Sequence, residues 1–296
     1  MIDFVIPLHK NNIIIRTVVE GIINFYNPIN IYIITSEISI KELNLNILHW
    51  IINKTKIILI DEFYFFVENY HLTRDDIEKW YLYKDEESRE FGWWYQQIIK
   101  LGAIHQIKNI SDPCVVWDSD LIPIKKWNIY PTEDELFYKF AILQYKEKNE
   151  LNKLEYSKSL FNLLNIPEYK INVGTMVPHH FILHHIVINN LIKYINDFHN
   201  INWIEKIISL SHKYYRFSEY KCIATYMHKF YPNFLQYHEY HLFGENGIRY
   251  RCNKEIIKDI YEKCFISNYG LEYTIFYNYT INNSSNIPSY IQIEHL

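Results

Sequence analysis

The chain has 296 residues and a net charge of −4 at pH 7, and 17% of its residues are aromatic. This length suits one large domain or two small ones, and a content of only 7 glycines excludes collagen-like and glycine-rich disordered chains. The charges form no long single-sign block, so the sequence offers no electrostatic footprint for nucleic-acid binding.

The cysteines and the apolar runs indicate a compartment. The cysteines show no C-x-x-C spacing and suit free thiols in a reducing compartment. They are Cys114, Cys222, Cys252 and Cys264. The start of the chain, MIDFVIP, carries no basic region, and no apolar run approaches the ~18 residues of a membrane span. We therefore expect a cytoplasmic protein without signal peptide or membrane span. The pattern leaves the oligomeric state undetermined.

The first half of the chain alternates between strand-like and helix-like apolar runs. The expected strands are residues 2–8, 29–35, 55–61 and the run that starts at 114. The expected helices are residues 13–26, 37–52 and 90–107. Strands that alternate with helices of this length predict an α/β fold with a mostly parallel sheet flanked by helices.

The second half is less regular. We expect a strand in 135–145, a polar insertion in 146–160 that is either helical or mobile, and a strand, a turn at Pro178 and a helix within 171–195. A further helix is expected to start at Ser218, which would cap it.

The run CVVWDSDLIPI places Asp118 and Asp120 inside otherwise apolar sequence. Aspartate is a poor strand residue and an unpaired buried carboxylate is costly, so the strand is expected to end at Asp118. Ligands of open α/β sheets lie outside the carboxyl ends of the strands, which favours a cleft where both carboxylates hold a cation. The alternative is a turn in which Asp118 and Ser119 bind local backbone groups.

Five segments carry a family resemblance in their order along the chain: FVIPLHK, WWYQQIIKLGA, WDSD, VGTMVPHHFI and FSEYKCIATYM. In this order they resemble a family of GT-A-type glycosyltransferases that was long catalogued as a domain of unknown function and has members in large DNA viruses. The chain is more loosely similar to glycogenin-like sugar-nucleotide transferases, which share a Lys-Leu pair, here Lys100-Leu101, before a D-x-D strand. The resemblance is weakest in residues 36–90 and after 255.

The resemblance implies one GT-A domain over residues 1–296, with a mixed, mostly parallel, Rossmann-like sheet. Residues 1–125 would form the nucleotide-sugar-binding half, which ends in the D-x-D motif, and residues 126–296 would form the acceptor-binding half. If the protein is viral, it would reside in the host cytoplasm or the virion.

The resemblance also implies a cation site and a donor site. Asp120 would bind Mn²⁺ or Mg²⁺ directly, and Asp118 would contact the ribose or the waters of the metal, because hard cations prefer oxygen ligands. Lys100 would face the donor, although a solvated lysine is the alternative reading. The implied donor-binding residues are Pro7, Gln96, Lys100, Asp118, Ser119, Asp120, Asn172, Gly174, Thr175, Arg249 and Arg251.

A further metal ligand is expected from the stretch QYHEYHLFGENGIRYR, because glycogenin-like enzymes use a histidine from this half of the chain. His241, in H-L-F-G, matches their H-x-x-G pattern better than His238, which is the second choice. Arg249 and Arg251 would hold the diphosphate. This stretch departs from the usual pattern because its basic residues are arginines with different spacing. A surface histidine is the alternative.

Glu219 in the SEY motif is the expected catalytic base. It would lie in the first turn of a helix, where the helix dipole favours a carboxylate. Inverting GT-A enzymes place a general base in the corresponding part of the fold, so Glu219 would deprotonate the acceptor hydroxyl. An ordinary helix-start glutamate is the alternative, and the KCIATYM ending departs from the family motif.

The stretch VPHHFILHHIV invites a second metal hypothesis, because His180 and His184 have the i, i+4 spacing of helical zinc ligands. No H-E-x-x-H glutamate lies between them, and the family uses a similar stretch as an acceptor-side wall. We therefore expect His179, with Asn172, Gly174 and Thr175, to contact sugar hydroxyls.

Together these residues predict a metal-dependent glycosyltransferase of the hexosyltransferase type. The donor would be a nucleotide-diphosphate sugar, most simply UDP-linked, and the acceptor a glycan or glycoprotein. One alternative is a sugar-nucleotide-forming nucleotidyltransferase, which would show a Gly-rich loop after its first strand, where PLHKNNIII has no glycine. The other is a non-catalytic carbohydrate-binding module of the same fold.

Overall fold

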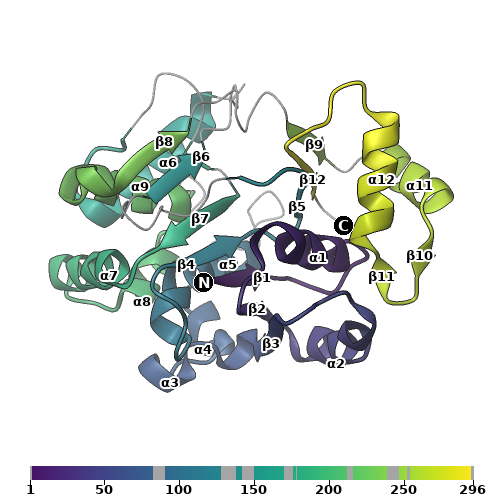
Figure 1. Ribbon diagram of the computed structural model, residues 1–296. Coiled ribbons are helices and arrows are strands. Elements are labelled where there is room, and N and C mark those ends of the chain that lie inside the picture. The colour runs from purple at the N-terminus through teal and green to yellow at the C-terminus, as the bar shows by residue number, and fades with distance from the viewer. Residues whose placement is uncertain are drawn as a thin grey trace.

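The computed structural model describes residues 2–82, 91–127, 138–141, 150–169, 176–177, 179–211, 216–238, 247–251 and 254–294. Its main sheet has five strands in the order β3-β2-β1-β4-β7 (Figure 1). These strands are β1 (Asp3–Pro7), β2 (Asn30–Thr35), β3 (Lys56–Asp61), β4 (Cys114–Trp117) and β7 (His180–Leu183). All neighbours pair in parallel except β7, which is antiparallel to β4. The expected α/β class with a mostly parallel sheet is confirmed.

The helices between these strands follow the predicted periodicity. They are α1 (Ile15–Tyr26), α2 (Glu37–Asn46) with the 3-10 turn η1 (Ile47–His49), and α5 (Phe91–Gln106). The short elements η2 (Glu62–Tyr64), α3 (Val67–Tyr70) and α4 (Arg74–Glu78) lie before α5. The helix expected in 90–107 is confirmed as α5, on which Trp94, Ile98 and Leu101 are buried as their spacing predicts, whereas His105 on the same predicted face is only half-buried.

The strand order creates a switch point beside β1. The chain steps from β1 to β2 to β3 in one direction and then returns across β1 to form β4. Right-handed crossovers therefore place α1 and α2 on one face of the sheet and α5 on the opposite face. The carboxyl ends of β1 and β4 diverge at this point, where open α/β sheets bind their ligands.

A second sheet, β5-β12-β9, extends from the end of the D-x-D segment. It consists of β5 (Leu121–Pro123), β12 (Tyr290–Glu294) and β9 (Gly247–Arg251), with β12 antiparallel to β5 and parallel to β9. Gly247 permits the close pairing of β9 and β12, because a Cβ atom there would come within 2.1 Å of the Tyr290 ring. This sheet brings the last strand of the described chain next to the D-x-D segment.

The remaining elements surround these sheets. They are β6 (Tyr138–Ala141), α6 (Glu150–Leu164), α7 (His185–His199), α8 (Trp203–Ser209), α9 (Glu219–Phe230), η3 (Pro232–Phe234), β8 (Leu235–His238), α11 (Lys254–Lys263), β10 (Ile266–Ser267), β11 (Gly270–Leu271) and α12 (Tyr273–Asn283). The helix predicted in 146–160 corresponds to α6, and β6 lies within the predicted strand 135–145. Ser218 caps α9 as predicted, since its side chain accepts a hydrogen bond from the backbone N–H of Lys221.

The order of elements predicted after Pro178 is wrong. The residues that follow it form strand β7 rather than a helix, and the helix starts only at His185. The reason is sheet pairing, because residues 180–183 pair with β4 along its whole length and are buried throughout. A contact with a neighbouring strand outweighs the helical spacing of the histidines.

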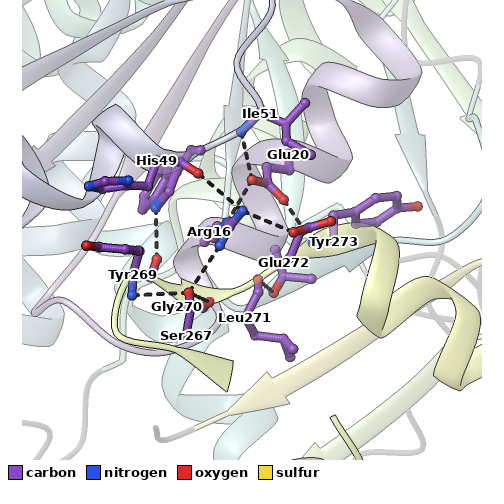
Figure 2. Close-up of polar contacts among 12 residues, drawn as sticks. Arg16, Glu20, His49, Ile51, Ser267, Tyr269, Gly270, Leu271, Glu272 and Tyr273 are labelled. Atoms are coloured by element: carbon purple, nitrogen blue, oxygen red, sulfur yellow. Dashed lines mark hydrogen bonds and ion pairs between the residues drawn. The ribbon is translucent and has the colours of Figure 1, made fainter. Parts of the chain in front are cut away.

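The C-terminal segment is anchored on α1 by a polar cluster around Arg16 (Figure 2). Arg16 and Glu20 form a buried ion pair at 2.8 Å, and Glu20 also accepts the backbone N–H groups of Ile51 and Tyr273, each at 2.9 Å. Glu272 lies 3.4 Å from the Arg16 guanidinium. The cluster therefore fixes the start of α12, the helix that precedes β12.

No helix in the described ranges combines the length and the apolar character needed to cross a bilayer.

Candidate active site

The D-x-D segment leaves the sheet at the switch point. Asp118 directly follows β4, and its backbone N–H donates to the carbonyl of His179 at 2.9 Å. The Leu121 N–H donates back to the Asp118 carbonyl at 3.2 Å, which closes a tight turn. The backbone does turn here, but the two carboxylates contact side chains from distant parts of the chain rather than the local backbone groups of the turn alternative. The turn serves to aim the carboxylates.

The carboxylate of Asp118 is surrounded by donors. Lys100 Nζ lies 2.6 Å and the Tyr220 hydroxyl 2.9 Å from Oδ1, and His179 Nδ1 lies 2.9 Å from Oδ2. Burial alone would raise the pKa of Asp118, but attraction to Lys100 and the contact with His179 outweigh it and hold this pKa well below its usual range. Asp118 is therefore ionised and fixed in place.

Lys100 is shared between two carboxylates. It projects from α5, is 4% exposed, and lies 3.1 Å from Glu219 Oε1 in addition to its contact with Asp118. Burial alone would lower its pKa, but the two carboxylates raise it, so the ammonium stays charged. Its nitrogen also lies 5.1 Å from the centre of the Tyr220 ring. The alternative of a solvated Lys100 is wrong, because the side chain is buried. A contact between Lys100 and the donor stays a prediction.

Glu219 opens α9 as predicted, but it is only 1% exposed. Burial raises the pKa of its carboxyl, although Lys100 acts in the opposite direction. Its Oε2 atom has no hydrogen-bond partner in the part of the chain that the structure describes. A raised pKa and an unpartnered oxygen are compatible with the expected general base, and this role of Glu219 stays a prediction.

Asp120 is held from the opposite side by Gln292 of β12. The Gln292 amide nitrogen lies 3.3 Å and 3.2 Å from the two oxygens of Asp120 and 3.2 Å from His179 Nδ1. His179 has a left-handed backbone with φ of 61°, a conformation that is uncommon for non-glycine residues. Four side chains from three parts of the fold thus form one polar chain: Asp118, His179, Gln292 and Asp120.

The other predicted donor residues are located as follows. Gln96 Nε2 lies 3.5 Å from the carbonyl of Pro7, at the carboxyl end of β1, so both border the switch point. Ser119 lies in the turn between the two aspartates. Arg249 of β9 is in register with Gln292, which places both on the same face of their sheet. The backbone of Arg251 is in register with that of Glu294 further along the same strands.

Several predicted residues lie outside the described residues. They are Asn172, Gly174, Thr175 and His241. The backbone of His238, the second choice for the metal, ends strand β8.

The histidine-pair hypothesis is wrong. His180 is on strand β7, whereas His184 is the N-cap of α7, so the two do not share a helical face. The His180 ring packs 5.2 Å from Trp117 and 4.7 Å from Trp127, centre to centre. Its role is in the aromatic core.

The described residues fit a hard cation in charge and in donor type. Asp118, Asp120 and Glu219 outnumber the Lys100 ammonium that contacts two of them, and the buried Gln292 Oε1 has no hydrogen-bond partner in the described ranges. Within those ranges no three or more His, Cys, Asp and Glu side chains gather as a metal site, so a cation here would need further ligands.

Sequence reasoning missed Tyr220 and Gln292. Tyr220 directly follows Glu219 in the SEY motif, so this motif was a signal from which Tyr220 could have been identified. Gln292 is the polar residue at the centre of YIQIE, and only the pairing of β12 with β5 reveals that it is 1% exposed and next to Asp120. The fold and site thus define an α/β protein with an acidic ligand site at its topological switch point.

The chain belongs to the family described as "Family of unknown function (DUF6492)", which it matches over residues 2–251. The expected membership in a family without assigned function is confirmed. No curated protein matches the chain at a significant level.

Solved structures give distant similarities. Mouse xyloside xylosyltransferase 1, apo form, has a TM-score of 0.48 and 9% identity, over 98% of this chain and 97% of that chain. The galactosyltransferase LgtC, in complex with donor and acceptor sugar analogs, has a TM-score of 0.48 and 8% identity, over 99% and 87%. HddC from Yersinia pseudotuberculosis has a TM-score of 0.34 and 13% identity, over 64% and 80%.

Proposed function

We propose that the protein is a divalent-cation-dependent glycosyltransferase with a GT-A-type fold. It would transfer a hexose from a nucleotide-diphosphate sugar, UDP-linked in the simplest case, to a glycan or glycoprotein acceptor. The observation that carries the proposal is the position of Asp118 and Asp120, which leave β4 at the switch point and are aimed by long-range side-chain contacts. The order of motifs along the chain supports the same class.

Asp120 would hold Mn²⁺ or Mg²⁺, with Asp118 as its neighbour and His241 as the predicted further ligand. When bound, the cation would neutralise the diphosphate of the leaving nucleotide. Lys100 keeps Asp118 ionised and fixed, so that the acidic pair is preorganised before the donor arrives. Arg249 would contact the diphosphate from the face of β9 that it shares with Gln292.

Glu219 would take the proton of the acceptor hydroxyl as the new glycosidic bond forms. Its raised pKa strengthens it as a base, and its Oε2 atom is the acceptor that no described group occupies. The Tyr220 hydroxyl donates to Asp118, and burial together with Asp118 raises its pKa, so it remains a neutral donor. In this assignment Asp120 would bind the cation and Glu219 would take the proton, while Asp118, the neighbour of Asp120, shares the Lys100 ammonium with Glu219.

A screen of sugar nucleotides with Mn²⁺ tests the proposal, with binding by calorimetry and slow hydrolysis of the donor as readouts. We expect one class of sugar nucleotide to bind and to be hydrolysed to free sugar and nucleoside diphosphate. The proposal is wrong if no sugar nucleotide binds. It is also wrong if the protein instead releases pyrophosphate from a nucleoside triphosphate and a sugar phosphate.

A further inference from the structure

The last strand of the described chain contributes to the candidate site, although it lies beyond the family match, which ends at residue 251. Gln292 is in register with Leu121 of β5 on one side and with Arg249 of β9 on the other. The next residue, Ile293, donates its backbone N–H to the Asp120 carbonyl at 3.0 Å. The backbone of β12 is therefore fixed to the turn that carries the two aspartates.

The segment that leads to β12 is fixed by further contacts outside the candidate site. The Thr17 hydroxyl donates to the Leu271 carbonyl at 2.6 Å. Glu20 accepts the backbone N–H of Tyr273 at the start of α12 (Figure 2). These contacts fix the start of α12, the helix that precedes β12. Gln292 thus reaches Asp120 from a strand that pairs with β5 on one side and β9 on the other.

The position of the Gln292 amide indicates what this side chain does. Its nitrogen lies 3.3 Å and 3.2 Å from the two oxygens of Asp120 and 3.2 Å from His179 Nδ1. An amide nitrogen donates hydrogens and a carboxylate accepts them, so the Gln292 amide donates to Asp120. Gln292 thus lies between Asp120 and the His179 ring, whose Nδ1 is also 2.9 Å from Asp118 Oδ2.

We propose that Gln292 is a positioning residue for the cation site, and this inference rests on the proposed function. Its amide holds the carboxylate of Asp120 against the Asp118–His179 pair, so that the two acids face the cation in one arrangement. Loss of this contact would leave Asp120 less restrained before the cation binds, and the additional ordering on binding would weaken affinity. Groups that orient metal ligands in this way typically contribute about 10–100-fold to metal affinity.

The test uses Gln292→Met, which keeps the length of the side chain and removes its donors. The matched control is Ile291→Met, which introduces the same residue one position earlier, where the side chain points to the other face of the strand. Mn²⁺ is titrated into each metal-free protein and the free ion is followed by electron paramagnetic resonance, with Asp120→Asn as the reference for a lost site. Urea unfolding without metal reports the stability of each variant.

We expect Gln292→Met to raise the Kd for Mn²⁺ by about 10-fold or more, while Ile291→Met leaves it close to that of the wild type. If Gln292→Met does not fold, Gln292→Asn carries the test, because its amide is one methylene too short to reach Asp120 and the same loss is expected. If Asp120→Asn abolishes binding and the Gln292 variants bind as tightly as the wild type, the inference is wrong and the proposed function stands. If the wild type binds neither Mn²⁺ nor a sugar nucleotide, the proposed function falls and this role falls with it.

Discussion

Replacement of Lys100 by methionine tests the electrostatic arrangement of the site. Methionine has nearly the length of lysine and suits the buried position on α5, so the substitution removes the charge with little change in packing. In the wild type the ammonium lies 2.6 Å from Asp118 and 3.1 Å from Glu219. Its loss leaves two buried carboxylates facing each other without a cation.

The cost of this substitution is large compared with the stability of a domain. Removing one partner of a buried ion pair costs about 3–5 kcal/mol, because the remaining charge is left uncompensated. Typical domains are stable by only about 5–15 kcal/mol, so Lys100→Met is expected to remove a large part of the total. The loss should shrink when Glu219→Gln is added, because the second variant removes one of the stranded charges.

Urea unfolding at pH 7 of the wild type, both single variants and the double variant measures this coupling as a double-mutant cycle. The matched control is Lys41→Met on α2, which removes the same group from a surface pair with Glu37 at 2.7 Å, where the lysine side chain is 71% exposed. We expect little change for Lys41→Met. A loss for Lys100→Met no greater than that of the control, or no coupling to Glu219, would refute the reasoning.

The pH dependence of stability, the rate of sugar transfer and the packing of β9 against β12 give three further tests. Burial raises the pKa of the Glu219 carboxyl above its usual 4.5, so ionisation of this group disfavours the folded state. The wild type should therefore lose stability relative to Glu219→Gln as the pH rises from 4.5 to neutrality. A difference in unfolding free energy between the two proteins that does not vary with pH contradicts this. Glu219→Gln should bind donor and cation normally and transfer sugar at least about a hundredfold more slowly; a rate within a few-fold of the wild type returns Glu219 to a helix-start role. Gly247→Ala should cost about 1–3 kcal/mol in unfolding experiments, because its Cβ would come within 2.1 Å of the Tyr290 ring. Gly92→Ala in α5 is the control, since among the described residues no atom outside its own helical turn and chain neighbours lies within 4 Å of a Cβ there. Equal effects of the two substitutions would contradict the packing argument.

The sequence predicted the parts of the fold that depend on local periodicity. The parallel strands, α1, α5 and the Ser218 cap all follow from the spacing of apolar residues and from capping chemistry. The end of β4 at Asp118 was predictable because an aspartate is costly inside a buried strand. These signals lie within about 20 consecutive residues, where spacing and propensity determine the outcome.

The partners of the candidate site were not predictable in the same way. Lys100 was assigned to the donor or to solvent, but it binds Asp118 and Glu219, which come from β4 and α9. Gln292 meets Asp120 across 172 residues of chain. Such contacts depend on sheet order, which a single sequence does not specify. For the same reason the strand after Pro178 was taken for a helix, since its pairing with β4 decides its structure.

We expect Asp120, in the turn that follows β4, to make donor binding depend on a divalent cation. Calorimetric titration of the sugar nucleotide found in the screen, into wild type and Asp120→Asn, with and without Mn²⁺, tests it most directly. Asn keeps the size of the side chain and removes its charge, so the variant should fold as the wild type does. The account predicts tight donor binding only for the wild type with Mn²⁺. Donor binding that is unaffected by both Mn²⁺ and the substitution would contradict it.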